Sequence, residues 1–315
     1  MLVPPRSPAV RSASAGSGAS SSPHAADPFR TVDGFAFGGS DTAPPGGSSP
    51  EATALTARLR RAGCVFAEDE AQLILATARS SDEAAAMAAR REAGLPLEHV
   101  LGWAEFHGLR IAVEPAVFVP RRRTEFLASR AIALAGRVST GRPVVVDLCC
   151  GSGAIGAAVL SAVPGAELVA ADVDATAVRC ARRNVEPLGG RVVAGDLFSA
   201  LPGGLRGRVD VLVANVPYVP SGEVAFLPAE ARDHEPHAAL DGGEDGLDVL
   251  RRVASGAPGW LAPGGALLVE TSASQAPDAV AAFRRAGLRA RLDGCGELPA
   301  TVVRGEARTA GAAGT

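Results

Sequence analysis

The sequence contains no lysine, so all 31 of its basic residues are arginine. Aromatic residues make up only 4% of the chain, which leaves Ala, Val and Leu as the main core formers. The formal net charge is −3 and the pI is about 6.0, and these values give no broad basic surface for a phosphate backbone. The composition therefore argues against a nucleic-acid-binding protein. We attribute the missing lysine to compositional bias rather than to function.

Cysteine is scarce and shows no metal-binding spacing. The chain has an odd number of cysteines and no C-x-x-C pair, and none of its five histidines has a neighbourhood typical of a metal ligand or a nucleophile. We therefore expect reduced thiols, with neither a disulfide framework nor a zinc or other metal site. The five cysteines are Cys64, Cys149, Cys150, Cys180 and Cys295.

Long apolar runs are also missing. No stretch reaches transmembrane length, and the first thirty residues have no apolar core of the kind that a secretory signal needs. We therefore expect a cytoplasmic protein without a membrane partner. With 315 residues, 47% hydrophobic residues and a mean hydropathy of +0.16, the chain can bury the core of one large domain or two unequal ones.

The first hundred residues divide into two parts of different composition. Residues 1–50 are dominated by Ser, Pro, Gly and Ala and lack apolar periodicity, which predicts a disordered tail. From residue 51 onward apolar residues recur at helical spacing, and Ser81-Asp82-Glu83 is typical of a helix start. Residues 51–100 are therefore predicted to form a small helical domain, too small to be very stable alone.

Residues 101–120 show a different pattern. Phe106, Leu109 and Ile111 alternate around Gly108, which predicts a β-hairpin that bridges two domains. The arginine run 121–123 that follows is expected to be a solvated face, because charge runs usually are.

Helix and strand patterns alternate through residues 121–305, which are expected to form one α/β domain before a disordered tail at 306–315. Alternation of this kind predicts a mostly parallel sheet with helices on both faces and ligands at the carboxyl ends of its strands. Strands are expected at 144–147, 167–171, 191–194, 209–214, 266–270, 288–292 and 300–303, and helices at 125–138, 154–163, 174–186, 247–257 and 275–286.

The first of these strands leads into a loop of small residues. From Val144 to Gly156 the sequence is Val-Val-Val-Asp-Leu-Cys-Cys-Gly-Ser-Gly-Ala-Ile-Gly, which predicts a buried strand, a tight turn and a helix start. Gly151 and Gly153 permit positive φ and close approach of a ligand, and a helix N-terminus presents its N–H groups to it. The pattern predicts a nucleotide-type site, with an ordinary strand-to-helix turn as the alternative.

An acid follows about twenty residues after the glycine loop. Asp172 comes directly after the strand predicted at 167–171, where an acid is suited to hydrogen-bonding the hydroxyls of a ribose. The alternative is a solvated helix cap before Asp174. The glycines depart from the G-x-G-x-x-G pattern of dinucleotide sites, so S-adenosylmethionine (SAM) fits better than NAD.

The only tyrosine of the chain lies in the stretch Asn215-Val-Pro-Tyr218, at the end of an apolar strand. An Asn side-chain oxygen and a neighbouring backbone carbonyl held rigid by Pro217 make two acceptors that could hold both N–H bonds of a planar amino group. The ring of Tyr218 could then cover the flat face of that group. The alternative is an Asn-Pro turn that closes a strand.

Together these stretches resemble a known enzyme family. Asp147-Leu-Cys-Cys-Gly-Ser-Gly is similar to the first motif of class I SAM-dependent methyltransferases, and residues 215–218 resemble the Asn-Pro-Pro-Tyr motif of methyltransferases that modify planar nitrogens. With their flanks they resemble the peptide-chain release factor glutamine N5-methyltransferases over about residues 55–305. These flanks are Leu101-Gly-Trp-Ala-Glu-Phe-His-Gly-Leu-Arg110, Val119-Pro-Arg121 with Thr124-Glu125, Gly195-Asp-Leu-Phe-Ser-Ala-Leu201, Glu235-Pro236 with Ala239-Leu240, and Gly243-Glu-Asp-Gly-Leu-Asp248.

The resemblance implies a Rossmann-like fold with a mostly parallel seven-stranded sheet, SAM as cofactor, and methylation of a glutamine amide in the Gly-Gly-Gln loop of a release factor. We also expect a cytoplasmic monomer that docks its protein substrate on residues 51–100. In the catalytic set, Asn215 and the Val216 carbonyl would orient the amide, and Pro217 and Tyr218 would complete the site. The residues that would bind SAM are Asp147, Cys149, Cys150, Gly151, Ser152, Gly153, Asp172, Asp196, Leu197 and Asn215.

Several positions depart from the family pattern. We still expect activity, because the Val216 backbone offers the same carbonyl and Pro217 keeps that residue extended. Two alternatives stay open: methylation of an exocyclic amine of DNA or RNA, and a SAM-binding interaction protein without turnover. The departures are Cys149 and Cys150 in place of Gly and Thr, Val216 in place of the first Pro of the quartet, Arg122 and Arg123 in place of a Pro-Glu pair, and Leu197 where an aromatic is common.

Overall fold

The computed structural model describes residues 49–139, 141–294 and 300–309. The chain divides into two units, Met1–Asp41 and Thr42–Thr315, and all described residues lie in the second. The predicted tail over residues 1–50 lies outside the described residues except for its last two positions. Of the tail predicted at 306–315, only 306–309 are described, and Glu306 is still the last residue of a strand.

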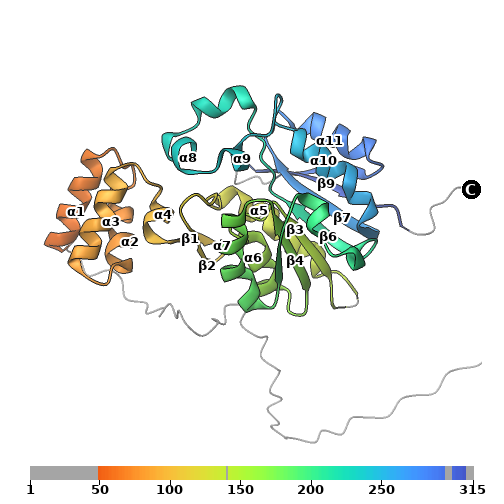
Figure 1. The fold of residues 1–315 in the computed structure, drawn as a ribbon, viewed down its shortest axis with the longest axis horizontal. Coiled ribbons are helices and arrows are strands. Elements are labelled where there is room, and N and C mark those ends of the chain that lie inside the picture. The colour runs from red at the N-terminus through yellow and green to blue at the C-terminus, as the bar shows by residue number, and fades with distance from the viewer. Residues whose placement is uncertain (1–48, 140, 295–299, 310–315) are drawn as a thin grey trace, which may run out of the picture. The chain divides into compact units, whose positions relative to one another are not determined.

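A seven-stranded sheet forms the centre of the fold (Figure 1), and its strands are β3 (Val144–Leu148), β4 (Glu167–Asp172), β5 (Arg191–Ala194), β6 (Val209–Ala214), β7 (Leu261–Thr271), β8 (Arg289–Gly294) and β9 (Thr301–Glu306). Their order in space is β5-β4-β3-β6-β7-β9-β8. The pairs from β5 to β7 are parallel, and β9 is antiparallel to both of its neighbours. The predicted mostly parallel seven-stranded sheet is confirmed.

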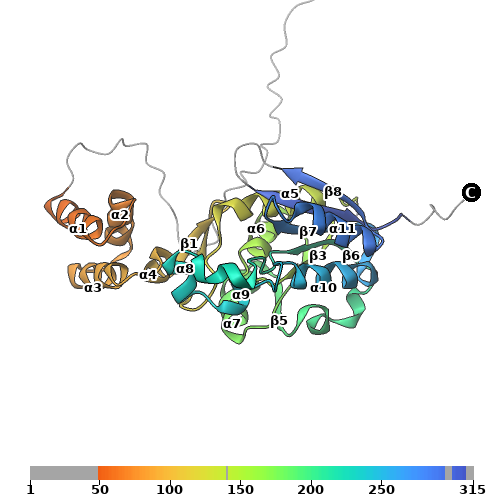
Figure 2. The same cartoon turned by 90° about the horizontal axis from the view of Figure 1, so that it is seen from above.

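Helices cover both faces of this sheet (Figures 1 and 2). Successive side chains along a strand point to opposite faces, so each face packs against its own group of helices. Val145 of β3 packs in a cluster with the helices that precede and follow β3 in the chain, whereas Val144 and Val146 pack in a cluster with two later helices. The first group is α5 (Glu125–Ala135), α6 (Ala154–Ala162) and α7 (Ala175–Val185), and the second is α10 (Asp248–Gly256) and α11 (Ala276–Arg285).

The N-terminal helices have a hydrophobic cluster of their own, in which Leu59 and Ile74 are fully buried. Ser80, one residue before the predicted start, caps the third helix by accepting a hydrogen bond from the Glu83 N–H at 3.2 Å. Arg91 and Glu70 form a buried ion pair at 2.7 Å between two of these helices. The helices are α1 (Pro50–Arg61), α2 (Ala67–Thr77), α3 (Ser81–Glu92) and α4 (Leu97–Leu101).

The predicted hairpin consists of β1 (Trp103–Phe106) and β2 (Leu109–Ala112), which pair antiparallel. Phe106 and Ile111 turn into the cluster that contains α5, α6 and α7. The hairpin therefore shares a core with the seven-stranded sheet.

Several short elements escaped the sequence analysis, because segments of three to six residues are too short to show an apolar period. Strand β7 also begins five residues earlier than predicted, beside a register shift between Val209 and Val211 of β6. Within the described ranges no helix is long and apolar enough to cross a membrane. Besides α4, the short elements are α8 (Ala229–His234), α9 (His237–Leu240) and the 3-10 turns η1 (Arg122–Thr124), η2 (Glu186–Leu188), η3 (Leu197–Ala200), η4 (Gly203–Leu205), η5 (Ser221–Phe226) and η6 (Ala257–Gly259).

Candidate functional site

The two central strands lead into loops that diverge. Leu148 at the end of β3 lies opposite Ala214 at the end of β6 in the parallel register. The chain continues from β3 toward β4 and β5 on one side and from β6 toward β7 on the other, so a crevice is expected at the carboxyl ends. A cavity of about 490 Å³ lies there. It is lined by most of the predicted site residues: Cys149, Cys150, Gly151, Ser152, Asp172, Asp196, Leu197, Asn215, Val216, Pro217 and Tyr218.

The loop after β3 depends on left-handed backbone at Cys149 (φ 54°), Gly151 (φ 54°) and Gly153 (φ 77°). A Cβ at position 153 would lie 2.7 Å from the Val185 side chain, so glycine is required for α7 to pack there. A Cβ at position 151 would meet no atom within 4 Å, which leaves room for a ligand beside the backbone. Cys149 adopts the same left-handed conformation at a cost of about 1 kcal/mol, which explains why the family pattern favours glycine at its position.

Asp172 connects the end of β4 to this loop. One of its carboxylate oxygens accepts the Gly151 N–H at 2.8 Å and the other accepts the Asp174 N–H at 2.9 Å. Asp174, and not Asp172, caps α7, since it accepts the N–H groups of Thr176 and Ala177. Burial raises the pKa of Asp172, and the two backbone N–H groups oppose that shift.

Asp147 lies within β3 and, like Gly153, is absent from the described lining of the cavity. Its side chain is completely buried, and one oxygen accepts the Gly156 N–H at 3.0 Å while the other has no hydrogen-bond partner. Burial raises the pKa of Asp147 to about 7, with a further contribution from the charge of Asp172. A group of this kind is sensitive to any charge placed in the cavity.

The loop after β5 supplies one apolar and one charged lining residue. Leu197 has φ 48° and joins the hydrophobic cluster on the α10 side of the sheet. The carboxylate of Asp196 pairs with Arg252 of α10 at 2.6 Å. The loop after β5 therefore presents a branched aliphatic side chain beside an acid that already has a partner.

The quartet after β6 is held at several points. The Oδ1 atom of Asn215 is buried and has no hydrogen-bond partner, and Val216 is buried beside it. The backbone carbonyl of Tyr218 accepts the Gln275 Nε2 at 2.8 Å, and the hydroxyl of Tyr218 donates to Glu270 Oε1 at 3.3 Å. The quartet thus presents a free buried acceptor on a fixed backbone.

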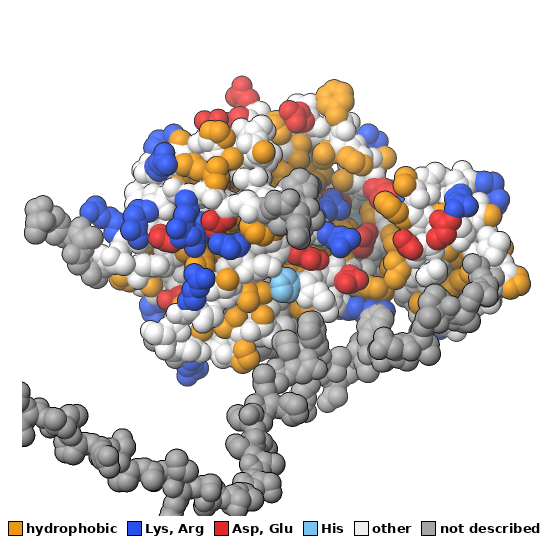
Figure 3. All heavy atoms as spheres, turned by 180° about the vertical axis from the view of Figure 1, so that it is seen from behind, with side chains coloured by type: hydrophobic (Ala, Val, Ile, Leu, Met, Phe, Trp, Pro, Cys, Tyr) orange, Lys and Arg blue, Asp and Glu red, His pale blue; other side chains and the backbone are white. Residues whose placement is uncertain are grey.

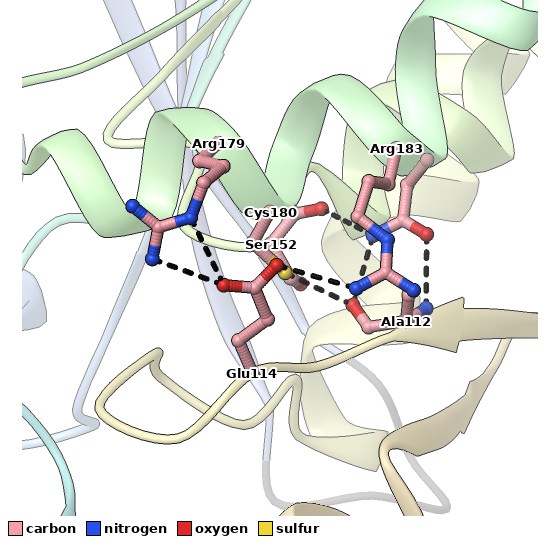
Figure 4. A network of polar contacts seen from close by, with 7 residues as sticks. Ala112, Glu114, Ser152, Arg179, Cys180 and Arg183 are labelled. Carbon is pink, nitrogen blue, oxygen red and sulfur yellow. Dashed lines mark hydrogen bonds and ion pairs between the residues drawn. The ribbon is translucent and has the colours of Figure 1, made fainter.

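A polar network joins the hairpin to the glycine loop (Figure 4). The side-chain amide of Asn184 on α7 accepts the Ala112 N–H at 2.9 Å and donates to the Ala112 carbonyl at 2.9 Å. It also donates to the carbonyl of Ser152 in the loop at 2.8 Å. On the solvent side Glu114 pairs with Arg179 and Arg183 of the same helix.

Comparison with known proteins identifies the family. The family described as "Methyltransferase small domain" matches residues 114–230. The chain is 39% identical over 241 residues to the release factor glutamine methyltransferase of Bradyrhizobium diazoefficiens, and the alignment covers 70% of this chain and 81% of that protein. The chain belongs to the release factor glutamine methyltransferase family. The family, the class I methyltransferase fold and the enzyme class predicted from the sequence are thereby confirmed.

Two further relatives differ in the names they carry. The release factor glutamine methyltransferase of Streptomyces coelicolor is 42% identical over 187 residues, which are 59% of this chain and 66% of that protein. The 4-amino-L-phenylalanine/4-methylamino-L-phenylalanine methyltransferase of Streptomyces pristinaespiralis is 40% identical over 201 residues, which are 63% of this chain and 68% of that protein.

SAM is the methyl donor of this release factor glutamine methyltransferase family, and the residues around the cavity fit it. Gly151 leaves open space where any other residue would place a side chain. Each oxygen of Asp172 accepts one backbone N–H and so keeps a further lone pair for a ribose hydroxyl. Asn215 supplies a buried acceptor that no group of the described chain satisfies.

The arginine run of this family member is exposed at two of its three positions, as predicted, but two of its side chains also pair with carboxylates. Arg121 forms an ion pair with the buried carboxylate of Glu235 at 2.6 Å, and Arg123 pairs with Glu270 at 3.1 Å. Arg122 and Arg123 are exposed, whereas Arg121 is only partly exposed. The two ion pairs were not predicted, because both acids lie more than one hundred positions further along the chain, where local charge patterning could not find them.

Sequence reasoning also missed Asn184, Gln275 and Arg252, which hold the loops after β3, β6 and β5, respectively. Lone polar residues on predicted helices gave no signal for these roles. Within the described ranges no cluster of His, Cys, Asp and Glu could hold a metal ion. The described cysteines, Cys64, Cys149, Cys150 and Cys180, are free thiols, and Cys295 lies outside the described residues.

Proposed function

We propose that this chain transfers a methyl group from SAM to the side-chain amide nitrogen of a glutamine in a peptide-chain release factor, in its Gly-Gly-Gln loop. The observation that carries the proposal is the Oδ1 atom of Asn215, a buried acceptor without a partner on the wall of the cavity, in a chain of this family. A buried acceptor that stays unpaired costs about 1–3 kcal/mol, and an incoming N–H would remove that cost.

The amide nitrogen is a poor nucleophile, because its lone pair is delocalised into the neighbouring carbonyl. Asn215 Oδ1 and the Val216 carbonyl would accept its two N–H bonds and fix the nitrogen in one orientation. This arrangement favours a more tetrahedral nitrogen whose lone pair points away from the two acceptors. SAM, when bound, supplies the electrophilic methyl group. Orientation and charge placement of this kind can contribute several kcal/mol to lowering the barrier. The nitrogen releases one of its protons after the transfer, so the chain needs no strong base beforehand.

The cofactor would be held by the loops after β3, β4 and β5. Asp172 would accept the ribose hydroxyls with its remaining lone pairs, and Gly151 and Ser152 would admit the methionine end. Asp196 and Leu197 would flank the adenine. Of the other residues predicted to bind SAM, Cys149 and Cys150 line the cavity. Asp147 and Gly153 do not line it and would support the loop after β3.

We assign the docking of the protein substrate to helices α1 to α4. Arg91 of α3 pairs with Glu230 of α8 at 2.6 Å, and Glu230 lines the cavity. The helices α1 to α4 are therefore connected to the wall of the cavity through this ion pair. The reaction then takes place in the cytoplasm, where translation terminates, with a monomer as the working unit.

A nucleic-acid substrate finds less support. On the face shown in Figure 3, arginine side chains lie close to acidic ones, and the arginines around the cavity, Arg121, Arg123 and Arg252, are each paired with a carboxylate. Paired arginines are poorly placed to neutralise a phosphate backbone.

An aromatic amine is the second candidate substrate. The observation that favours it is the 40% identity to an enzyme named for 4-amino-L-phenylalanine. An arylamine presents two N–H bonds on a planar group, as an amide does, so the quartet could orient either. The larger ring would have to fit between the quartet and the side chains of α8 and α9 that line the cavity.

The deciding experiment incubates the full chain and labelled SAM with intact release factor, with 4-amino-L-phenylalanine and with nucleic acid, followed by mass spectrometry. The proposal expects one methyl group on the glutamine of the Gly-Gly-Gln loop, and intact release factor as a far better acceptor than a short peptide. Asn215→Ala should lower turnover tenfold to a thousandfold while SAM affinity falls much less. Label in the amine or in nucleic acid but not in protein would overturn the proposal.

A further inference from the structure

Arg123 departs from the family pattern, which has an acid at its position, and it lies on the wall of the cavity. The residue belongs to η1, far in sequence from the groups it touches. Its Nε donates to Glu270 Oε1 at 3.1 Å, and its Nη2 donates to the hydroxyl of Tyr218. Its guanidinium carbon lies 5.7 Å from the centre of the Tyr218 ring.

The three side chains form a closed set of contacts, since the Tyr218 hydroxyl also donates to Glu270 Oε1. The Glu270 side chain is only 2% exposed, and its second oxygen is buried without a partner. A buried carboxylate needs a cation nearby, and no cation other than Arg123 is paired with Glu270 among the described residues. The Arg123 side chain is 44% exposed, so part of its charge is screened by solvent.

The two ends of Tyr218 are therefore fixed by different parts of the chain. Its backbone carbonyl is held by Gln275 at the start of α11, and its hydroxyl is held by Arg123 and Glu270. With the backbone alone fixed, the ring could still rotate about its side-chain bonds. The contacts at the hydroxyl are what select one ring orientation.

We propose that Arg123 is a positioning residue, which fixes the ring of Tyr218 against the acceptor nitrogen through its contacts with the Tyr218 hydroxyl and Glu270. The inference rests on the proposed role of Tyr218 in the quartet. If the Arg123–Glu270 ion pair only stabilised the fold, its loss would lower the melting temperature. A positioning residue instead changes turnover, and it does so through the Tyr218 hydroxyl.

The first test is kinetic, with release factor as acceptor. Arg123→Gln should lower kcat about tenfold and leave the acceptor KM and the SAM affinity within about threefold, and Arg123→Lys should recover part of the loss. Tyr218→Phe removes the hydroxyl through which Arg123 acts, so Arg123→Gln should cost at most about twofold more in that background. Arg122→Gln, which changes the exposed neighbour, is the matched control and should match the wild type.

Independent effects of Arg123→Gln and Tyr218→Phe that multiply in the double variant would overturn the proposal, as would full kcat in Arg123→Gln. Wild-type protein that fails to methylate release factor at all would instead count against the proposed function. Melting temperatures of each variant separate loss of fold from loss of turnover.

The second test needs no acceptor, because Tyr218 is the only tyrosine of the chain. Carbon-13 labelling of tyrosine rings therefore gives NMR signals from Tyr218 alone. Arg123→Gln should shift and sharpen these signals as the ring gains rotational freedom, and Arg122→Gln should leave them in place. Unchanged ring signals in Arg123→Gln would rule out a positioning role even if turnover fell.

Discussion

The side-chain nitrogen of Asn184 lies 2.8 Å from the carbonyl oxygen of Ser152 and donates a hydrogen bond to it. The same nitrogen donates to Ala112 of the hairpin, so one amide group connects the glycine loop, α7 and the segment that precedes the sheet. All the polar atoms of this side chain are used for backbone contacts, which is how a lone polar residue can fix a loop that carries no regular structure.

Asn184→Asp should weaken SAM binding about tenfold and lower the free energy of unfolding by about 1–3 kcal/mol. The substitution keeps the size of the side chain and the acceptor for Ala112, but an oxygen replaces the donor and faces two carbonyl oxygens. Calorimetry with SAM and denaturant unfolding measure the two effects. Arg183→Gln on the same helix removes only an exposed ion pair and should change stability by less than about 1 kcal/mol. Unchanged SAM affinity in Asn184→Asp would mean that the loop does not depend on this contact.

Asp172→Ala should weaken SAM binding by roughly 1–3 kcal/mol, because it removes the proposed acceptor for the ribose hydroxyls and releases the Gly151 N–H. Asp174→Ala is the control: it removes the cap of α7, which typically lowers stability by about 1 kcal/mol, and should affect SAM binding less. Titration calorimetry of both variants provides the comparison. If the two lose equal affinity, the ribose lies elsewhere.

Gly153→Ala should mainly lower stability, whereas Gly151→Ala should mainly weaken SAM binding. At position 153 the new methyl group would lie 2.7 Å from Val185 on a left-handed backbone, so the free energy of unfolding should fall by about 2–4 kcal/mol. At position 151 it meets open space, so stability should fall by only about 1–2 kcal/mol, whereas SAM affinity should fall sharply because the methyl group occupies the cavity. Thermal melts with and without SAM distinguish the two. A Gly151→Ala protein that binds SAM normally would place the cofactor away from this loop.

The ligand-free protein should lose stability as the pH rises from about 4 to about 7. Burial raises the pKa of Asp147 to about 7, against about 3.9 for an Asp in an unfolded chain. Between these values the native state binds the proton more tightly than the unfolded state, so the free energy of unfolding falls with pH, by a few kcal/mol over the window. Below about pH 4 none of this stability is lost, and above about pH 7 the loss is complete.

Asp147→Asn tests this titration, because it should flatten the pH dependence while leaving the smaller contribution of Asp172, whose pKa is also raised. Denaturant unfolding of the wild type and of Asp147→Asn at pH 5 and pH 8 shows how steeply the free energy of unfolding of each protein changes with pH. Equal slopes in the variant and the wild type would show that Asp147 does not titrate in this range.

The sequence by itself determined the order and kind of the long elements. Strands β5 and β6 begin and end where the apolar pattern predicts, and the glycine loop, Asp172 and the quartet come together at the carboxyl ends because parallel strands bring their ends to one edge. These features depend on local periodicity and turn chemistry, which a sequence displays directly. The glycine spacing favoured SAM over NAD, and the resemblance to a family then added the substrate class.

The tertiary structure alone decided which polar groups meet across the fold. Arg123 and Glu270 are 147 positions apart, Arg121 and Glu235 are 114 apart, and Asn184 and Ser152 are 32 apart. Such pairs depend on the sheet order and on which distant segments meet, and neither is encoded in a local pattern. The helices α8 and α9 are likewise too short to show a period of their own, and their residues line the cavity, with Glu230 of α8 paired to Arg91 of α3.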